Sequence, residues 1–246
     1  MIASLPSTMP ATSAEVIYPD SDGKPMAENT LQYEWIVLLK ENLEVLFEAN
    51  SAVFVAGDLL WYPVQGHPEI AKAPDVMVIV GRPKGYRGSY KQWEEGDIAP
   101  QVVFEVLSPG NTRAEMSNKL VFYHEYGVEE YYSYDPEAND LRGWMRREGI
   151  LEELDSLQDW VSPRLGIRFN PQMAPLQVYF PNGDRFLSTL EREQLRQQER
   201  QRATAAEQRA TVAEHRATAA EQRADRLAAK LRELGLDPNS LNGDSV

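Results

Sequence analysis

One long segment constrains what this chain can fold into more than any other feature. Residues 186–234 contain no glycine or proline and consist mainly of Ala, Glu, Gln, Arg and Leu, all strong helix formers. A seven-residue near-repeat reads RATAAEQ, RATVAEH, RATAAEQ, RADRLAA and KLRELGL. It places apolar residues at heptad position a (Ala203, Ala210, Ala217, Ala224, Leu231) and position d (Ala206, Ala213, Ala220, Leu227, Leu234). This period predicts a long helix that forms a coiled coil.

Association of copies through this tail follows from the same period. We expect residues 196–234 to join the chain into a homo-oligomer. The alternative is a lone solvated helix with Glu–Arg pairs along its surface. Alanine buries little apolar area, so the predicted seam is weak until Leu227, Leu231 and Leu234.

Composition limits the chemistry that the rest of the chain can perform. The 246 residues include no cysteine and only three histidines. Disulfides, Fe–S clusters, thiol nucleophiles and sulfur-ligated zinc are therefore excluded, and a Ser-His-Asp triad has little material. Any metal site must use oxygen ligands, which suit Mg²⁺, Mn²⁺ or Ca²⁺.

The charge of the chain is unevenly distributed. Residues 1–185 hold 15 Lys and Arg against 28 Asp and Glu, whereas residues 186–246 hold 10 of each, so the first part carries the whole net charge of −13. An acidic body argues against broad non-specific nucleic-acid binding but leaves room for a local basic cleft. No apolar run approaches membrane-spanning length, and the first residues lack a signal-like pattern. We expect a cytoplasmic protein with no membrane partner.

Residue composition and hydrophobic pattern divide the chain into three parts. Residues 1–24, rich in Ser, Thr, Pro and Asp, predict a flexible arm. Residues 25–185 predict an α/β domain, and residues 186–246 the helical tail. Within the domain we expect helices over residues 29–50 and 113–126, the second ended by Gly127. We expect strands over residues 74–80, 101–108, 130–134, 141–146 and 176–180, and a hairpin or bulged strand over 52–56 and 58–62; residues 155–185 otherwise give little signal.

Two of these strands each carry one carboxylate. The runs PDVMVIV (74–80) and QVVFEVLS (101–108) are apolar on both faces, which is typical of central strands in a covered sheet. Asp75 lies in the first run and Glu105 in the second. An isolated buried carboxylate costs several kcal/mol, and a divalent cation shared by both residues would offset that cost. Exposure to water, or pairing with an arginine, remains the alternative, especially for Asp75 beside a proline.

A lysine on the second helix completes this set. Lys119 borders the apolar stripe formed by Met116, Leu120 and Tyr123, so its ammonium group could reach the strand carboxylates. The alternative is an ordinary helical pair with Glu115, four residues earlier. Two carboxylates, a divalent ion and a lysine suit phosphodiester hydrolysis. The metal polarises the phosphate and lowers the pKa of a bound water, while the lysine stabilises developing negative charge.

The order of these residues resembles a known family. The PD dipeptide followed by a strand glutamate resembles the PD-(D/E)XK nucleases. The longer match of PDVMVIV and FEVLSPGNTRAEMSNKLVFYHEYGVEEYYSYDP resembles the Uma-two family of restriction endonucleases, over about residues 25–185. The resemblance implies a restriction-endonuclease-like core, a central mixed sheet flanked by helices, and DNA as substrate. It also implies Mg²⁺ or Mn²⁺ bound by Asp75, Glu105 and the carbonyl of Val106. Leu107 stands where the superfamily has its usual lysine, and the resemblance gives that role to Lys119.

Other residues are weaker candidates. Glu28, Asp58 and Glu115 could add carboxylates to the site, although a helix-start role suits Glu28 and a turn suits Asp58. A loop rich in cations and aromatic rings could contact nucleic acid, with Arg113 as a further candidate; its cations are Arg82, Lys84, Arg87 and Lys91. The same loop could simply be solvated. The leading hypothesis is a Mg²⁺-dependent DNA endonuclease; the alternative is an inactive, nuclease-like adaptor that oligomerises through its tail.

Overall fold

The computed structural model describes residues 16–23, 25–235 and 237. The chain divides into two compact units between Ser188 and Thr189. We call the described residues up to Ser188 the head, and the helix that begins at Thr189 the tail.

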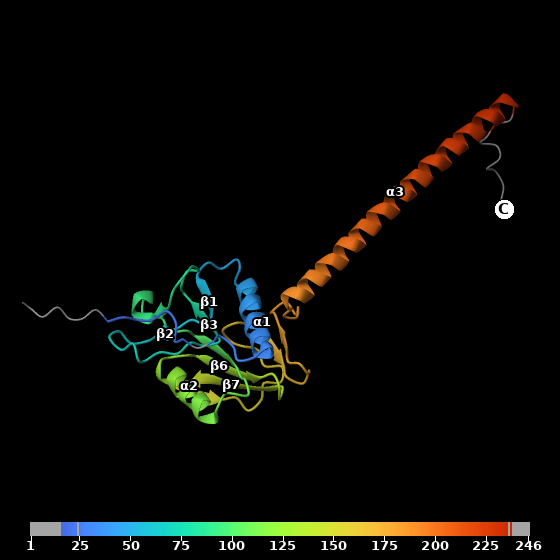
Figure 1. Ribbon diagram of the computed structural model, residues 1–246. Coiled ribbons are helices and arrows are strands. Elements are labelled where there is room, and N and C mark those ends of the chain that lie inside the picture. Colours follow the sequence, from blue (N-terminus) through green and yellow to red (C-terminus); the bar gives the residue numbers. More distant parts are fainter. Residues whose placement is uncertain (1–15, 24, 236, 238–246) are drawn as a thin grey trace, which may run out of the picture. The chain divides into compact units, whose positions relative to one another are not determined.

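A six-stranded mixed sheet forms the centre of the head, in the order β1-β3-β5-β6-β7-β8 (Figure 1). The strands are β1 (Val53–Gly57), β3 (Val76–Val80), β5 (Val102–Val106), β6 (Glu130–Asp135), β7 (Asp140–Arg147) and β8 (Ile150–Glu153). Neighbours are antiparallel except β5 and β6, which run parallel and are connected through helix α2 (Arg113–Glu125). The two strands that were apolar on both faces, β3 and β5, are central, as their composition predicts.

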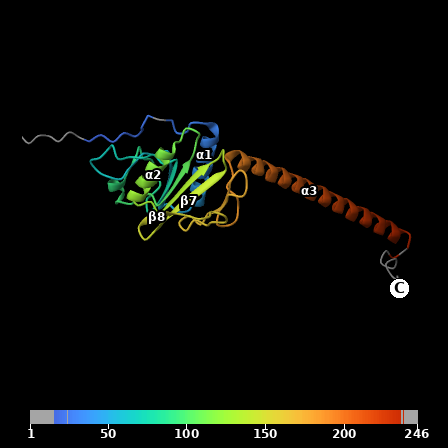
Figure 2. The same cartoon turned by 90° about the horizontal axis from the view of Figure 1, so that it is seen from below.

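Two helices cover opposite faces of this sheet (Figure 2). Asn29 caps the start of helix α1 (Thr30–Leu46), because its side chain accepts a hydrogen bond from the Gln32 N–H. Thr112 caps the start of helix α2, because its hydroxyl accepts a hydrogen bond from the Glu115 N–H. Gly127, at φ +89°, follows the end of α2 in the left-handed conformation that favours glycine. The predicted fold class is confirmed: an α/β unit with a mixed sheet flanked by helices, and a long C-terminal helix.

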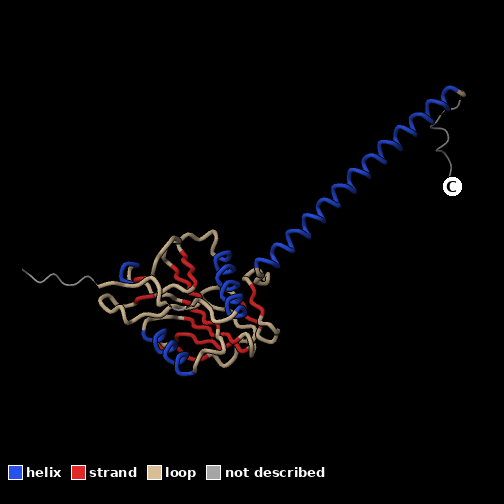
Figure 3. The backbone as a smooth tube through the Cα atoms, viewed as in Figure 1, coloured by secondary structure: helices blue, strands red, loops and turns tan. Residues whose placement is uncertain are grey.

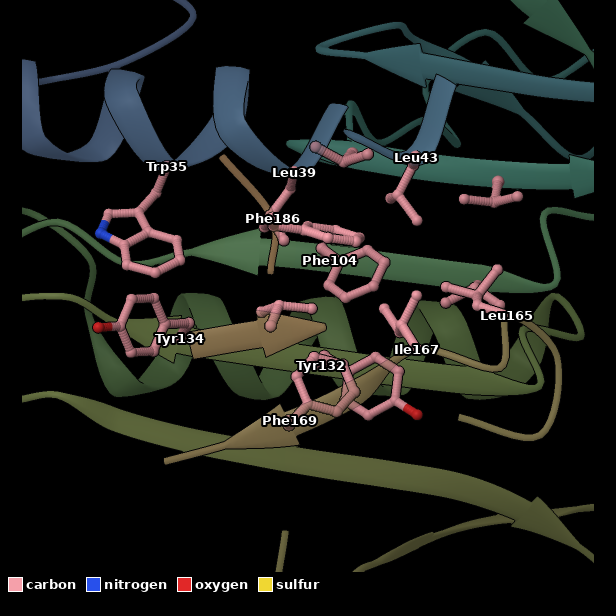
Figure 4. Close-up of a cluster of buried hydrophobic side chains, with 14 of the residues drawn as sticks. Trp35, Leu39, Leu43, Phe104, Tyr132, Tyr134, Leu165, Ile167, Phe169 and Phe186 are labelled. Carbon is pink, nitrogen blue, oxygen red and sulfur yellow. The ribbon is translucent and has the colours of Figure 1, made fainter. Parts of the chain in front are cut away.

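Each face of the sheet has its own hydrophobic core. On the first face, Trp35, Leu39 and Leu43 of α1 point toward Phe104 and the chain around Phe186 (Figure 4). On the second face, α2 packs through residues including Tyr123 over an aromatic cluster; its other members include Trp61, Tyr131 and Trp144. Two buried layers hold the central strands rigidly between them.

Short strands complete the head (Figure 3). Strand β2 (Trp61–Tyr62) pairs in parallel with β4 (Tyr90–Lys91), which a 3₁₀ turn (Gln92–Glu95) follows. Strands β9 (Arg168–Asn170) and β10 (Gln177–Tyr179) form a second small sheet. The hairpin or single bulged strand expected over 52–62 is wrong, because β1 pairs with β3 while β2 joins β4. Strand β1 contributes to both cores, with Val55 in the first and Phe54 in the second, and Trp61 of β2 lies in the second.

The chain before α1 is described only in part. Residues 1–15 and 24 of the predicted arm lie outside the described residues. Residues 16–23 contact the rest of the head. The Tyr62 hydroxyl donates to the Pro19 carbonyl at 2.8 Å, and the Tyr18 ring packs against the Tyr62 and Trp93 rings.

The tail is one helix, α3 (Thr189–Glu233), of 45 residues. This confirms the long helix predicted from composition, and none of its residues is buried within the chain. The coiled coil and the oligomer stay predictions. In the described part of the chain, no helix is both long and apolar enough to cross a membrane.

Candidate active site

The predicted site lies at a cleft in the head, about 1020 Å³ in volume, whose described lining includes Asp75 but not Glu105. Asp75 and Lys119 line it, together with residues of the arm, of α1 and of the loops after β1 and β5. Val76 of β3 lies opposite Phe104 of β5 in the antiparallel register. Asp75, just before β3, therefore comes level with Glu105. Pairing of these strands, which lie far apart in sequence, creates the acid pair.

Asp75 is almost fully buried, at 8% exposed. Its Oδ2 accepts a hydrogen bond from the Val106 N–H at 2.6 Å. Burial raises the pKa of the Asp75 carboxyl well above its usual value, and the neighbouring Glu105 charge raises that pKa further, while Lys119 opposes the change. The expected alternative, an exposed strand-end acid, does not hold for this residue.

Glu105 is still more buried, at 2% exposed, and is held by two groups from α2. Lys119 Nζ lies 2.7 Å from Glu105 Oε2, and the Tyr123 hydroxyl donates to Oε1. Burial alone would lower the pKa of Lys119, but the Glu105 and Asp75 charges outweigh it, so the pKa lies above its usual value. Lys119 therefore stays protonated at neutral pH, and its ion-pair partner is Glu105 of the strand rather than Glu115.

Gln32 of α1 is a site neighbour that the sequence interpretation missed. Its Nε2 donates to the Val106 carbonyl at 2.8 Å, and its Oε1 accepts from the Glu28 N–H at 2.8 Å. The Val106 carbonyl, predicted as a metal ligand, thus already has one donor and could offer a metal only its other lone pair. The position of Gln32 as an amide on the buried face of α1, 6% exposed, was the available signal. Tyr123 was also missed, since it reads as part of the apolar stripe.

The three weaker acidic candidates all line the same cleft. Glu28 Oε2 accepts from the Ser108 hydroxyl at 2.5 Å and lies so close to Gly110 that a side chain at 110 would collide with it. Burial raises the pKa of Asp58, with added contributions from the charges of Asp22 and Glu105. Glu115 Oε2 has Asn111 Nδ2 at 3.4 Å. The cleft is therefore acidic.

The donor set fits a hard divalent cation. Two buried carboxylates share one lysine, which leaves negative charge that a cation would compensate. Carboxylate oxygens are the ligands that Mg²⁺ and Mn²⁺ prefer. Among the residues that the structure describes, no group of three or more His, Asp or Glu is assembled to hold an ion. Asp75 and Glu105 would therefore need water or substrate oxygens to complete the coordination, as is usual for Mg²⁺.

The basic loop lies apart from the described lining of the cleft. Arg82 and Arg87 both bind Glu95, with Nε to carboxylate distances of 2.9 and 2.6 Å. Lys84 Nζ donates to the Phe47 carbonyl at 2.6 Å, and Lys91 Nζ is 3.6 Å from Glu94. These contacts show that the loop's cations help to hold the head together.

Cations nearer the site come from other elements. Lys72, which the sequence interpretation did not select, lines the cleft together with Lys119. Arg113 is exposed at the start of α2. Nucleic-acid contact by the loop cations and Arg113 stays a prediction.

The comparisons with known proteins concern mainly the head. The family model Uma2, described as "Putative restriction endonuclease", matches residues 21–177, a range that includes Asp75, Glu105 and Lys119. Among solved structures, the chain is similar to the crystal structure of a putative nuclease belonging to DUF820 from Anabaena variabilis ATCC 29413. That similarity has 14% identity and a TM-score of 0.41, over 58% of this chain and 78% of that chain. No curated protein sequence matches the chain significantly.

Proposed function

The chain belongs to the Uma2 family of putative restriction endonucleases, and from this membership and its acid pair we propose that it is a divalent-metal-dependent DNA endonuclease. The observation that carries the proposal is the convergence of Asp75, just before β3, Glu105 of β5 and Lys119 of α2. The first and the last line the cleft, and Glu105 is buried in contact with Lys119. Structural ion pairs also exist in proteins, but a buried acid pair beside a cleft, with a strongly perturbed pKa, is typical of a functional site.

Each residue has a distinct part in this proposal. Asp75 and Glu105 would hold Mg²⁺ or Mn²⁺ where β3 begins and β5 ends. Such an ion supplies Lewis-acid polarisation of a phosphodiester and lowers the pKa of a bound water. Lys119 Nζ presents a permanent positive charge, which stabilises the negative charge that develops on the phosphate oxygens. Tyr123, whose pKa is raised by burial and by Glu105, stays protonated and orients the glutamate.

The acidity of the cleft predicts that DNA binding depends on the metal. Its described lining contains five carboxylates, from Asp22, Glu28, Asp58, Asp75 and Glu115, against two lysines, Lys72 and Lys119. A phosphate backbone would be repelled by this excess without a compensating cation. We therefore expect DNA binding with Ca²⁺ or Mg²⁺ present and little binding in EDTA.

Cleavage of plasmid DNA by the purified chain tests the proposal. We expect cutting with Mg²⁺ or Mn²⁺, and a loss of at least about 100-fold in Asp75→Asn and in Glu105→Gln, since each removes charge from the site where the ion supplies its rate enhancement. Glu153→Gln is the matched control, because Glu153 is a strand carboxylate that is exposed and pairs with Arg142. Near-UV circular dichroism would verify that every variant is folded. Equal cutting by wild type and Asp75→Asn would reject the assignment.

A second candidate function is a non-catalytic adaptor that keeps the nuclease fold. The observation that favours it is the close Lys119–Glu105 ion pair, which already satisfies part of the acid pair without a metal. Titration with Mn²⁺ separates the two functions. A folded sample that binds no Mn²⁺, and whose Glu105→Gln variant behaves identically, would support the adaptor.

A further inference from the structure

The charges of the tail follow the same seven-residue period as its apolar residues. With Ala203 at position a, three successive e positions are acidic and four successive g positions are basic. The e positions are Glu207, Glu214 and Glu221; the g positions are Arg202, Arg209, Arg216 and Arg223. This segment lies beyond residue 177, where the match to the family model ends.

The three glutamates have no ion-pair partner within their own helix. The residues three and four positions away from each of the three glutamates are Ala, Thr or Asp, never Lys or Arg. Within residues 189–233, all of which the structure describes, none of these glutamates forms an ion pair. A lone polar helix is normally stabilised by many pairs at these spacings. The alternative of a solitary helix with Glu–Arg pairs therefore does not fit this segment.

Pairing with a second copy would provide the missing partners in one orientation only. In a parallel, in-register pair, each g position faces the e position five residues later on the other helix. Arg202 then faces Glu207, Arg209 faces Glu214, and Arg216 faces Glu221. An antiparallel pair would set g against g and e against e, so Arg would face Arg and Glu would face Glu.

The leucines of the tail favour the same arrangement. Leu227 and Leu234 are 55% and 75% exposed in the single chain, although they lie at the predicted seam. Parallel alignment in register packs Leu227, Leu231 and Leu234 against their own copies. An antiparallel alignment of residues 203–234 would set each of them against an alanine, which buries less apolar area.

We propose that α3 pairs with α3 of a second copy as a parallel, in-register, two-stranded coiled coil, directed by its Arg(g)–Glu(e) contacts and closed by its C-terminal leucines. Parallel alignment brings the two heads to the same end of the paired tails, because each tail begins directly after its own head. This inference concerns the tail alone and does not depend on the proposed nuclease activity.

Cysteine cross-linking of the full chain tests the orientation cleanly, because the natural sequence has no cysteine. Ala210→Cys at position a should give a disulfide-linked dimer in high yield under mild oxidation, since equivalent a positions approach within disulfide distance. Gln208→Cys at the outward f position is the matched control and should give less than about a tenth of that yield, because f positions point away from the partner. Equal yields from both variants would overturn the proposal. So would cross-linking that occurs only when Ala210→Cys and Leu227→Cys chains are mixed, which is the antiparallel result.

Charge reversal tests the role of the g and e positions. Wild type should show a light-scattering mass of twice 27.9 kDa. The double variants Arg209→Glu/Arg216→Glu and Glu214→Arg/Glu221→Arg should each have the mass of one chain, and an equal mixture of the two should recover the doubled mass. Arg226→Glu at the outward c position should leave the dimer intact. A single-chain or threefold mass for wild type, or unchanged dimers in both double variants, would contradict the proposal.

Discussion

Asp75 and Glu105 share Lys119 as their neighbouring cation, so the stability of the head depends on the charge of this lysine. Replacing Lys119 by methionine keeps the apolar stem but leaves the buried carboxylates uncompensated. We expect Lys119→Met to lower the free energy of unfolding by about 3–5 kcal/mol at pH 7, the range found when one partner of a buried ion pair is removed. Urea unfolding would measure this change.

The double variant distinguishes lost charge balance from lost packing. Lys119→Met/Glu105→Gln removes both ionised partners, so much of the lost stability should return. Mg²⁺ in excess should also stabilise Lys119→Met more than the double variant, because an ion binds the native acid pair. A double variant as unstable as the single one would show that the Lys119 stem matters more than its charge.

Glu95 gives a prediction of pH dependence away from the site. Hydrogen bonds from Arg87, and then from Arg82, hold the pKa of the Glu95 carboxyl below its usual value of 4.5. A carboxyl with a lowered folded-state pKa stabilises the protein fully above its unfolded pKa, and this stabilisation is lost as the pH falls through the folded pKa. Glu95→Gln should therefore cost about 2 kcal/mol at pH 7. The difference in free energy of unfolding between wild type and Glu95→Gln, measured with urea, should narrow below about pH 4.5. A difference that stays constant at all pH values would contradict this account.

Individual residues of the site were predictable to different degrees. Asp75 and Glu105 interrupt otherwise apolar strands, and Lys119 borders an apolar helical stripe, so their chemistry contrasts with their neighbours. Gln32 and Tyr123 act through atoms of other elements, the Val106 carbonyl and the Glu105 carboxylate. Those partners become neighbours only once the sheet is assembled. Arg82 and Arg87 are the opposite case, since the sequence selected them as nucleic-acid contacts. The structure pairs both with the carboxylate of Glu95 in the same loop.

At the scale of elements, one buried glutamate connects strand β6 to the irregular segment that follows the sheet. Glu130, 1% exposed, accepts hydrogen bonds from the Tyr132 hydroxyl, the Ser162 hydroxyl and the Arg164 N–H. Glu130→Gln turns an acceptor oxygen into a donor against two hydroxyls, so we expect a loss of about 3 kcal/mol in urea unfolding. Glu129→Gln, next to it but at the surface with Arg164, should cost less than about 1 kcal/mol. Similar losses in both variants would show that the buried network is not the cause.

The elements themselves show why part of this fold is readable from sequence. Helices α1 and α2 combine a period of 3.6 with Asn29 and Thr112 at their starts, and strands β3 and β5 are continuous apolar runs. Strands β2 and β4 have two residues each, too few to show any period. The segment 157–186 contributes many core residues, although its strands β9 and β10 have only three residues each; these core residues include Leu165, Ile167, Phe169 and Val178. Such wrapping depends on tertiary contacts, which local patterns do not encode.

At the scale of the whole molecule, the chain is a head followed by a helix that contributes no buried residue to it. Close to the start of the tail, the Leu187 N–H donates to buried Asn42 at 3.2 Å, and the Asn42 amide donates to the Leu187 carbonyl at 3.0 Å. A chain ending at Ser188 keeps this closure, so its head should unfold within about 3 °C of the full chain in calorimetry. A larger decrease would mean that the tail stabilises the head directly.

The two proposals together predict how DNA is broken. If parallel tails bring two heads to one end, then after one head has cut one DNA strand, the opposite strand lies at high effective concentration for the second head. The full chain should then convert supercoiled plasmid to linear DNA early, whereas the chain ending at Ser188 should accumulate nicked circles. The full-length variant Arg209→Glu/Arg216→Glu is the decisive control, because it keeps the tail but should not pair. If it linearises plasmid as wild type does, the heads cut independently of the tail; if it only nicks, paired heads are what makes the double-strand break.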